Sequence, residues 1–116
     1  MNVTINRDLV AASATPLLLA LLDTEESYGY RIIQRIKESS NGAIEWSEGM
    51  LYPVLHRLEK RGLVSSSWKV SEQGRRRKYY ALTQKGREEL QRQRREWLAV
   101  QGTLHRIGFM APANGE

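Results

Sequence analysis

The feature that most constrains this chain is a change of hydrophobic periodicity between residues 47 and 82. In residues 47–61 the apolar side chains recur at helical spacing and lie within one arc of a helical wheel. They are Leu51, Val54, Leu55 and Leu58. Gly62 predicts the end of this helix. Residues 63–70 and 75–82 then have the pattern of strands, joined by a polar turn at residues 71–74. The sequence therefore predicts an amphipathic helix followed directly by a two-stranded hairpin.

The rest of the chain must complete one small hydrophobic core. With 116 residues, 41% of them hydrophobic, there is room for one domain and not for a second core. The chain has no cysteine, which excludes disulfides, zinc–thiolate sites and a thiol nucleophile. His56 and His105 lie far apart in sequence, and no paired-carboxylate site, nucleophile–base pair or glycine-rich phosphate loop stands out. We therefore expect no enzyme, no catalytic residues, no metal site and no cofactor.

The N-terminal apolar run, Leu17–Leu22, is much too short to cross a bilayer, and it lacks a basic leader or a cleavage-site signature. We expect a soluble, cytoplasmic protein that does not contact membranes. The run is apolar on every side, which predicts a short buried helix with Thr15 as its N-cap and Pro16 at its first position. Alternatively, the helix begins near Asn6 and Pro16 kinks it.

A second helix is expected after the polar break at residues 23–26, with Ser27 as its cap. One face of this helix carries Gly29, Ile32, Ile33 and Ile36. The glycine would let the helix pack closely. Asn41-Gly42 predicts a turn, and residues 44–46 are long enough for only a brief strand.

The third helix, opened by Ser47, has a polar face of small residues opposite its apolar arc. The polar arc carries Gly49, Pro53, His56 and Lys60, flanked by Met50, Tyr52 and Arg57. Because proline lacks a backbone N–H, Pro53 in the second turn predicts a late helix start or a local kink.

The last helix is expected from Gln84, with Thr83 as its cap, to about Ile107, where Gly108 ends it. Its apolar side includes Gln101 and a repeat every seven residues, as in a helix that packs against a partner helix. A small domain cannot cover a stripe of this length completely, so we expect a homodimer. The predicted dimer interface comprises Leu90, Trp97, Val100, Leu104 and Ile107.

Positive charge is concentrated in one stretch of the sequence. Residues 57–95 contain 13 basic and 4 acidic residues, a balance of +9, whereas the whole chain has a net charge of +5. Within this stretch Arg75-Arg76-Arg77-Lys78 alternate sides along the second hairpin strand, so at least two of the four should face solvent. Such a surface is suited to neutralising phosphates.

The order helix, helix, short strand, helix, two-stranded hairpin is that of a winged helix-turn-helix, a mainly α fold of the α+β type. In this fold the third helix enters the major groove of DNA, and the hairpin, or wing, lies beside the phosphates or in the minor groove. We expect residues 1–83 to bind double-stranded DNA, residues 84–108 to form the dimerisation helix and residues 109–116 to be a disordered tail. The predicted DNA contacts are Ser47, Gly49, Met50, Tyr52, Pro53, His56, Arg57, Lys60, Arg75, Arg76, Arg77 and Lys78.

Several aromatic residues allow a structural interpretation as well as a functional one. Tyr52 either contacts a phosphate or packs its ring against the hairpin. Trp46 and Trp68 are expected to pack between the hairpin and the helices. Tyr79 and Tyr80 alternate, so one of them should be in the core. For the chain as a whole, the alternative to DNA binding is a basic protein-interaction module without a specific operator.

Three stretches of the chain resemble the PadR family of transcriptional regulators, in particular its short subfamily with a single C-terminal helix. They are LLLALLDTEESYGYRIIQRI, EGMLYPVLHRLEKRGLVSSSW and GRRRKYYALTQKGREEL, and together they span roughly residues 17–105. The resemblance implies a dimeric winged-helix repressor in which the last helix forms the dimer interface. Several relatives respond to phenolic acids or flat hydrophobic drugs.

The resemblance also implies a small aromatic or hydrophobic effector bound between the subunits. Trp97 matches the position of an aromatic residue in such pockets, although Arg94 and Glu96 beside it are charged. The ligand-binding residues would be Trp97, Gln93, Val100, Gln101 and Leu9. From its spacing alone, Trp97 is equally well explained as a core residue of the dimer interface.

Overall fold

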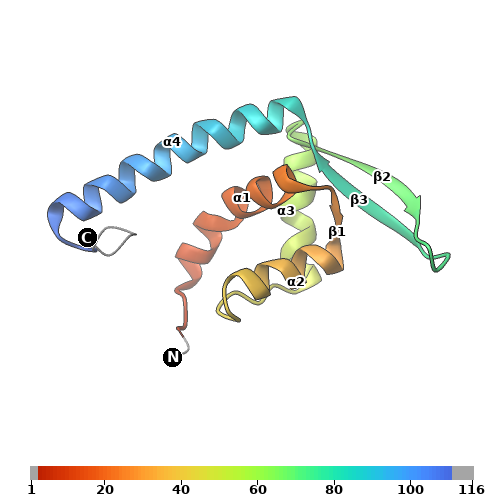
Figure 1. The fold of residues 1–116 in the computed structure, drawn as a ribbon, viewed down its shortest axis with the longest axis horizontal. Helices are drawn as coiled ribbons and strands as arrows, with labels where there is room; N and C mark the ends of the chain where they lie inside the picture. The colour runs from red at the N-terminus through yellow and green to blue at the C-terminus, as the bar shows by residue number, and fades with distance from the viewer. Residues whose placement is uncertain (1–2, 111–116) are drawn as a thin grey trace.

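Four helices and a three-stranded antiparallel sheet make up residues 3–110, the part of the chain that the computed structural model describes (Figure 1). In chain order the elements are α1 (Arg7–Thr24), β1 (Ser27–Tyr28), α2 (Gly29–Ser39), α3 (Glu48–Lys60), β2 (Val64–Val70), β3 (Arg76–Leu82) and α4 (Gln84–Ile107). This arrangement is the predicted winged helix-turn-helix of the α+β type, extended by a long C-terminal helix.

Helix α1 begins at Arg7, where the Asn6 side chain caps it by accepting a hydrogen bond from the Asp8 backbone N–H at 2.8 Å. The helix continues through Pro16 to Thr24. The predicted start at Thr15 is therefore wrong, and the alternative start near Asn6 is confirmed. A proline inside a helix removes one backbone donor and crowds the carbonyl four residues earlier, so the helix needs support from packing. The core-facing residues on both sides of it, Ala14 and Leu18, hold the helix together by packing.

The short third strand forms at a different place from the predicted one. Residues 44–46 form no strand, and Ser27, expected to cap α2, pairs with β3 instead. In β1, Ser27 lies opposite Tyr80 and Tyr28 lies opposite Tyr79, which gives the sheet the order β1-β3-β2. The chain reaches the free edge of β3 at residues 27–28, and α2 begins immediately afterwards at Gly29.

The turn at residues 41–42 and the start of α3 follow the local sequence signals. Asn41 and Gly42 both have positive φ angles, of 52° and 83°, as the predicted turn requires. Helix α3 begins at Glu48, directly after Ser47, so the late start predicted from Pro53 is wrong. The carbonyl that loses its helical partner to Pro53 belongs to Gly49, an exposed residue, and water can therefore satisfy it.

The core lies between α1, α2 and α3 and the root of the sheet. The apolar arc of α3 is buried as predicted, at Leu51, Val54, Leu55 and Leu58. Tyr80, 1% exposed, supplies the predicted core tyrosine from β3. Trp46, 6% exposed, also belongs to this core. Helix α3 is therefore held in place by one hydrophobic core that it shares with α1, α2 and the root of the sheet.

The β2–β3 hairpin projects from this core as a wing (Figure 1). Its root is buried at Val64 and Leu82, but Val70, near the tip, is 70% exposed. Trp68 is 57% exposed, so the prediction that it packs between the hairpin and the helices is wrong. The reason is geometric: the alternation of β2 points Trp68 to the same side as Val64, but at this distance from the root there is no core to receive it.

Helix α4 leaves the root of the wing and runs along one edge of the molecule (Figure 1). Its predicted bounds are confirmed: Thr83 Oγ1 accepts from the Gly86 N–H at 3.0 Å, and Gly108 ends the helix with a φ angle of 92°. Phe109 and Met110 are exposed, and residues 111–116 of the predicted tail lie outside the described residues.

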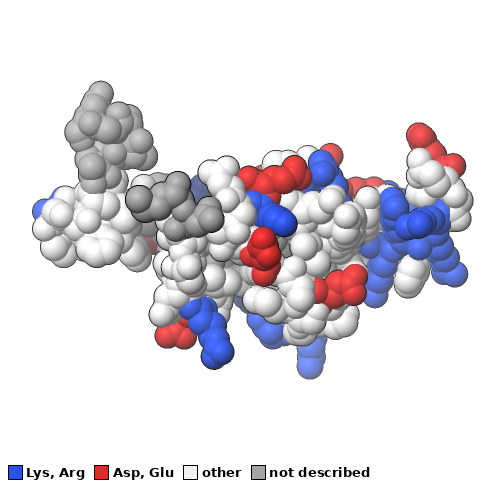
Figure 2. All heavy atoms as spheres, turned by 90° about the horizontal axis from the view of Figure 1, so that it is seen from below, with Lys and Arg blue, Asp and Glu red and all other residues white. Residues whose placement is uncertain are grey.

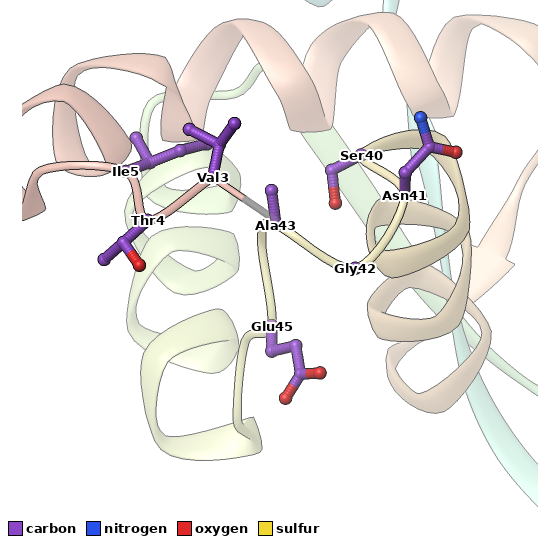
Figure 3. A pocket seen from close by; sticks show the side chains of 8 residues that line it. All are labelled: Val3, Thr4, Ile5, Ser40, Asn41, Gly42, Ala43 and Glu45. Atoms are coloured by element: carbon purple, nitrogen blue, oxygen red, sulfur yellow. The ribbon is translucent and has the colours of Figure 1, made fainter. Parts of the chain in front are cut away.

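The chain before α1 lies beside the loop that joins α2 to α3. Residues 3–5, residues 40–43 and Glu45 line a mostly polar hollow of about 680 Å³ (Figure 3). Glu45, the acidic residue of its lining, pairs with Lys37 at 3.4 Å. The hollow lies at the end of α2 that is farther from the wing (Figure 1). Because Glu45 is paired with Lys37, the lining carries little free charge.

Candidate nucleic-acid interface

The polar arc of α3 is a continuous exposed face. Gly49, Pro53, His56 and Lys60 are all exposed, while every residue of the opposite arc is buried. The flanking residues Met50 and Arg57 are exposed as well. Small and polar side chains of this kind let a helix approach base edges closely.

The wing adds a cluster of uncompensated positive charge. Arg75 and Arg76 are exposed and Arg77 and Lys78 are half-buried, so at least two of the four face solvent as predicted. Within residues 3–110 none of these four side chains pairs with a carboxylate; Arg76 instead lies 4.9 Å from the centre of the Trp68 ring. Lysine and arginine side chains gather over this end of the molecule, at the right of Figure 2.

A hollow of about 330 Å³ brings the wing and α3 together on one surface. Glu48 and Tyr52 of α3 line it from one side, and Trp68 and Arg75–Lys78 line it from the other. Residues 28–30, at the start of α2, complete it. Of the lining residues, Tyr28, Gly29, Tyr30, Glu48 and Trp68 were not among the predicted contacts. The pairing of β1 with β3 places three of them here, and no local sequence signal indicated that pairing.

Tyr52 links α3 to the start of α2. A Cβ atom built on Gly29 would overlap the Tyr52 hydroxyl, so the absence of a side chain at Gly29 is what admits the tyrosine. Burial, together with the nearby Glu48 carboxylate, raises the pKa of Tyr52 above its ordinary value. The close packing predicted for Gly29 is therefore present, with Tyr52 as the group packed against it.

The remaining sequence-predicted DNA contacts also lie on the exposed side of the fold. Ser47 and Lys60, at the two ends of α3, are exposed. Glu59, which could have neutralised Lys60 or Arg57, instead accepts a hydrogen bond from Ser66 Oγ of the wing at 2.6 Å. Both cations therefore remain available on the surface of α3.

The apolar stripe of α4 is covered only near the start of the helix. Leu90, 3% exposed, belongs to the core of its own chain. Farther along, Trp97 is 42%, Val100 55% and Ile107 76% exposed. Leu104, Gln93 and Gln101 are half-buried, and Leu9 of α1 is exposed. A small apolar hollow of about 150 Å³ lies beside Trp97 and Val100.

Residues 18–92, which contain α3, the wing and the start of α4, match the transcriptional regulator PadR-like family. The chain belongs to this family. It is also 30% identical over 96 residues to an uncharacterised protein of Lysinibacillus sphaericus, covering 83% of this chain and 88% of that protein.

Solved structures place this PadR-like chain among transcriptional regulators. A transcriptional regulator from Clostridium thermocellum superimposes with a TM-score of 0.80 at 28% identity, over 90% of this chain and 99% of that one. A PadR-like transcriptional regulator from Bacillus cereus has a TM-score of 0.77 at 30% identity, over 86% of this chain and 95% of that one.

The chain is therefore a PadR-family transcriptional regulator, a class of proteins that bind DNA and are not enzymes. This assignment favours gene regulation over the alternative of a basic protein-interaction module. Within residues 3–110, no helix is long and apolar enough to cross a membrane.

Proposed function

We propose that this PadR-family regulator is a homodimeric repressor that holds operator DNA between α3 and the wing of each subunit. Helix α3 would enter the major groove with Gly49, Pro53, His56 and Lys60 toward the bases. Arg75–Lys78 of the wing would neutralise phosphates. The observation that carries the proposal is the hollow that α3 and the wing share: Glu48 and Tyr52 line it from α3 and Arg75–Lys78 from the wing, so the cations of the wing lie beside α3.

The homodimer is proposed from the exposed stripe of α4. Trp97, Val100 and Ile107 would be removed from water by a second copy of the helix, which favours association. Operator half-sites in successive turns of DNA lie about 34–36 Å apart, and a dimer would offer one α3 helix to each of them.

A salt titration tests the DNA-binding surface. Affinity for duplex DNA should fall steeply with salt, with a slope of log affinity against log salt of about −0.9 per neutralised phosphate. Replacing Arg75 and Arg76 by glutamine removes up to four phosphate contacts per dimer, and should flatten the slope by about 3 to 4. The matched control replaces Arg94 and Arg95, exposed cations of α4, and should leave the slope nearly unchanged. Equal slopes in the two double variants would reject the wing as the phosphate-binding element.

Sedimentation equilibrium tests the dimer. Val100→Asp places a charge in the proposed interface and should shift the protein to a monomer at micromolar concentration. Ala99→Asp adds the same charge to the next exposed position, which points away from the stripe, and should leave the dimer intact. A wild-type monomer at these concentrations, or a Val100→Asp dimer as stable as that of Ala99→Asp, would exclude this interface.

We further propose that a small planar aromatic or hydrophobic compound binds between the two α4 helices. Trp97 would stack on it, with Val100, Gln93 and Gln101 around it and Leu9 of α1 at its edge. A ligand wedged here would change the spacing of the two α3 helices and so alter operator affinity. Planar aromatic compounds should quench tryptophan emission of the wild type, and Trp97→Ala should abolish the response at a protein concentration at which sedimentation shows the variant to be a dimer. Retained ligand binding in this variant would reject the stacking role.

A further inference from the structure

A further hollow lies between the N-terminal half of α1 and α3. Its volume is about 260 Å³, just below the roughly 300–1,000 Å³ of most small-molecule pockets, which limits it to a small ligand. It is separate from the α4 stripe, because no α4 residue lines it. Its walls are mainly apolar, with Ala11 and Ala14 on the α1 side and Val54 on the α3 side.

One tryptophan and two arginines without partners border this hollow. Trp46 forms part of the lining, and its indole N–H is buried without an acceptor among residues 3–110. Arg7 and Arg57 also line the hollow, and in the described part of the chain neither guanidinium pairs with a carboxylate or donates a hydrogen bond. A ligand that supplies a charged acceptor here would therefore pair with two guanidinium groups that are free to donate.

The charged residues around the hollow indicate that its ligand carries a negative charge. Arg7 is in the first turn of α1, where the helix dipole is positive and a cation is unfavourable unless an anion lies nearby. Asp8, the next residue, does not line the hollow. Arg57 approaches the same hollow from the last turn of α3. Two arginines facing apolar walls are suited to a carboxylate attached to an apolar body.

We propose that each subunit binds a small apolar carboxylate between α1 and α3, with the carboxylate at Arg7 and Arg57 and the apolar body against Trp46, Ala11 and Val54. This site is distinct from the effector site proposed between the α4 helices. Met50 and Arg57 of its lining are also sequence-predicted DNA contacts on α3. A bound carboxylate therefore competes with phosphate for Arg57 and weakens DNA binding, and DNA weakens carboxylate binding by the same factor.

The test uses octanoate as the probe and Trp46 as the reporter. The chain has three tryptophans, so the Trp68→Phe/Trp97→Phe double variant leaves Trp46 as the only one. In this background octanoate should change Trp46 emission saturably and bind at least tenfold more tightly than octanol, which has the same chain length without the charge. Octanoate should also reduce the affinity for a mixed-sequence duplex several-fold.

Two further variants in the same background separate charge from shape. Arg7→Gln/Arg57→Gln should raise the octanoate Kd at least tenfold without affecting octanol, whereas Arg94→Gln/Arg95→Gln, with the same change of net charge on α4, should leave it unchanged. Ala11→Leu fills the hollow from an exposed position of α1 and should abolish binding while the circular dichroism spectrum stays native.

The proposal is overturned by the absence of a saturable Trp46 response, by equal affinity for octanoate and octanol, or by full binding in the Ala11→Leu variant. Octanoate binding that leaves duplex affinity unchanged overturns the competition for Arg57. Duplex binding without octanoate is measured in the same series, so failure of this site is distinguishable from failure of DNA binding.

Discussion

The packing of α4 against the root of the wing can be tested with two glycines of this helix, because it predicts how alanine at each position changes the free energy of unfolding. Gly86 is buried, and a Cβ atom there would overlap the backbone oxygen of Leu63 and lie 2.6 Å from Leu82 Cδ1. Gly102, farther along α4, is half-buried, and its Cβ would meet only the Arg106 guanidinium, at 3.2 Å. The same substitution, glycine to alanine, should therefore have opposite effects at the two positions.

The magnitudes follow from helix propensity and packing. Alanine in place of a helical glycine gains about 1 kcal/mol, which should appear almost fully for Gly102→Ala because the arginine terminus can move aside. At Gly86 the same gain is opposed by overpacking of about 1–3 kcal/mol. In addition, the displaced Leu63 carbonyl accepts from Thr83 N at 3.0 Å and from Thr83 Oγ1 at 3.0 Å. Weakening these two hydrogen bonds costs about 0.5–1.5 kcal/mol each. The net expectation for Gly86→Ala is a loss of about 1–5 kcal/mol, opposite in sign to the effect of Gly102→Ala.

Urea unfolding at fixed protein concentration measures both variants against the wild type, because association would make the midpoint concentration-dependent. We expect the midpoint to fall for Gly86→Ala and to rise for Gly102→Ala. If Gly86→Ala were as stable as Gly102→Ala, the contact between α4 and the Leu63 carbonyl would not be a rigid packing contact, and the position of α4 on the wing would need revision.

Two further predictions concern single contacts. The pKa of Glu89 is lowered to about 2 by hydrogen bonds from Arg92 and Gln93, so the stability this carboxylate contributes is complete above its unfolded pKa near 4.5 and is lost as pH falls toward 2. Over this window the wild type should lose more free energy of unfolding than Glu89→Gln, and parallel pH profiles would contradict the assignment. Gly29→Ala should lower the free energy of unfolding by about 1–3 kcal/mol. Tyr52→Phe should relieve part of this loss in the double variant, and strict additivity would show that the two residues do not touch.

Elements whose signals lie within the element itself were predicted well from the sequence. Helix α4 has a capping threonine at one end and a glycine with positive φ at the other, and both act at their predicted positions. The apolar arc of α3 is also buried as its spacing indicates. In each case the residues that determine the element are a few positions apart, so local rules are sufficient.

The features that were not predicted depend on contacts between distant segments. Ser27 has the chemistry of a helix cap, but the neighbouring edge of β3 draws it into a strand. Trp68 has the composition of a core residue, but its exposure depends on how far the wing extends beyond the body. The hollow between α3 and the wing has the same origin, because it needs β1 beside β3. Sequence periodicity predicts which face of an element is apolar, but not whether another element covers it.

Aromatic residues of the wing and of β1 lie beside the arginines of the wing. Arg76 lies 4.9 Å from the centre of the Trp68 ring, and Arg77 lies 4.3 Å from that of Tyr28. A cation over an aromatic ring at an exposed site gains about 0.5–1 kcal/mol, enough to favour one side-chain orientation without cancelling the charge. Lys69, by contrast, pairs with the Glu26 carboxylate, which competes directly with a phosphate. Aromatic neighbours therefore orient the arginines while leaving them free to bind an anion, so Arg76 and Arg77 should contribute more to DNA affinity than Lys69, although all three lie on the same hairpin.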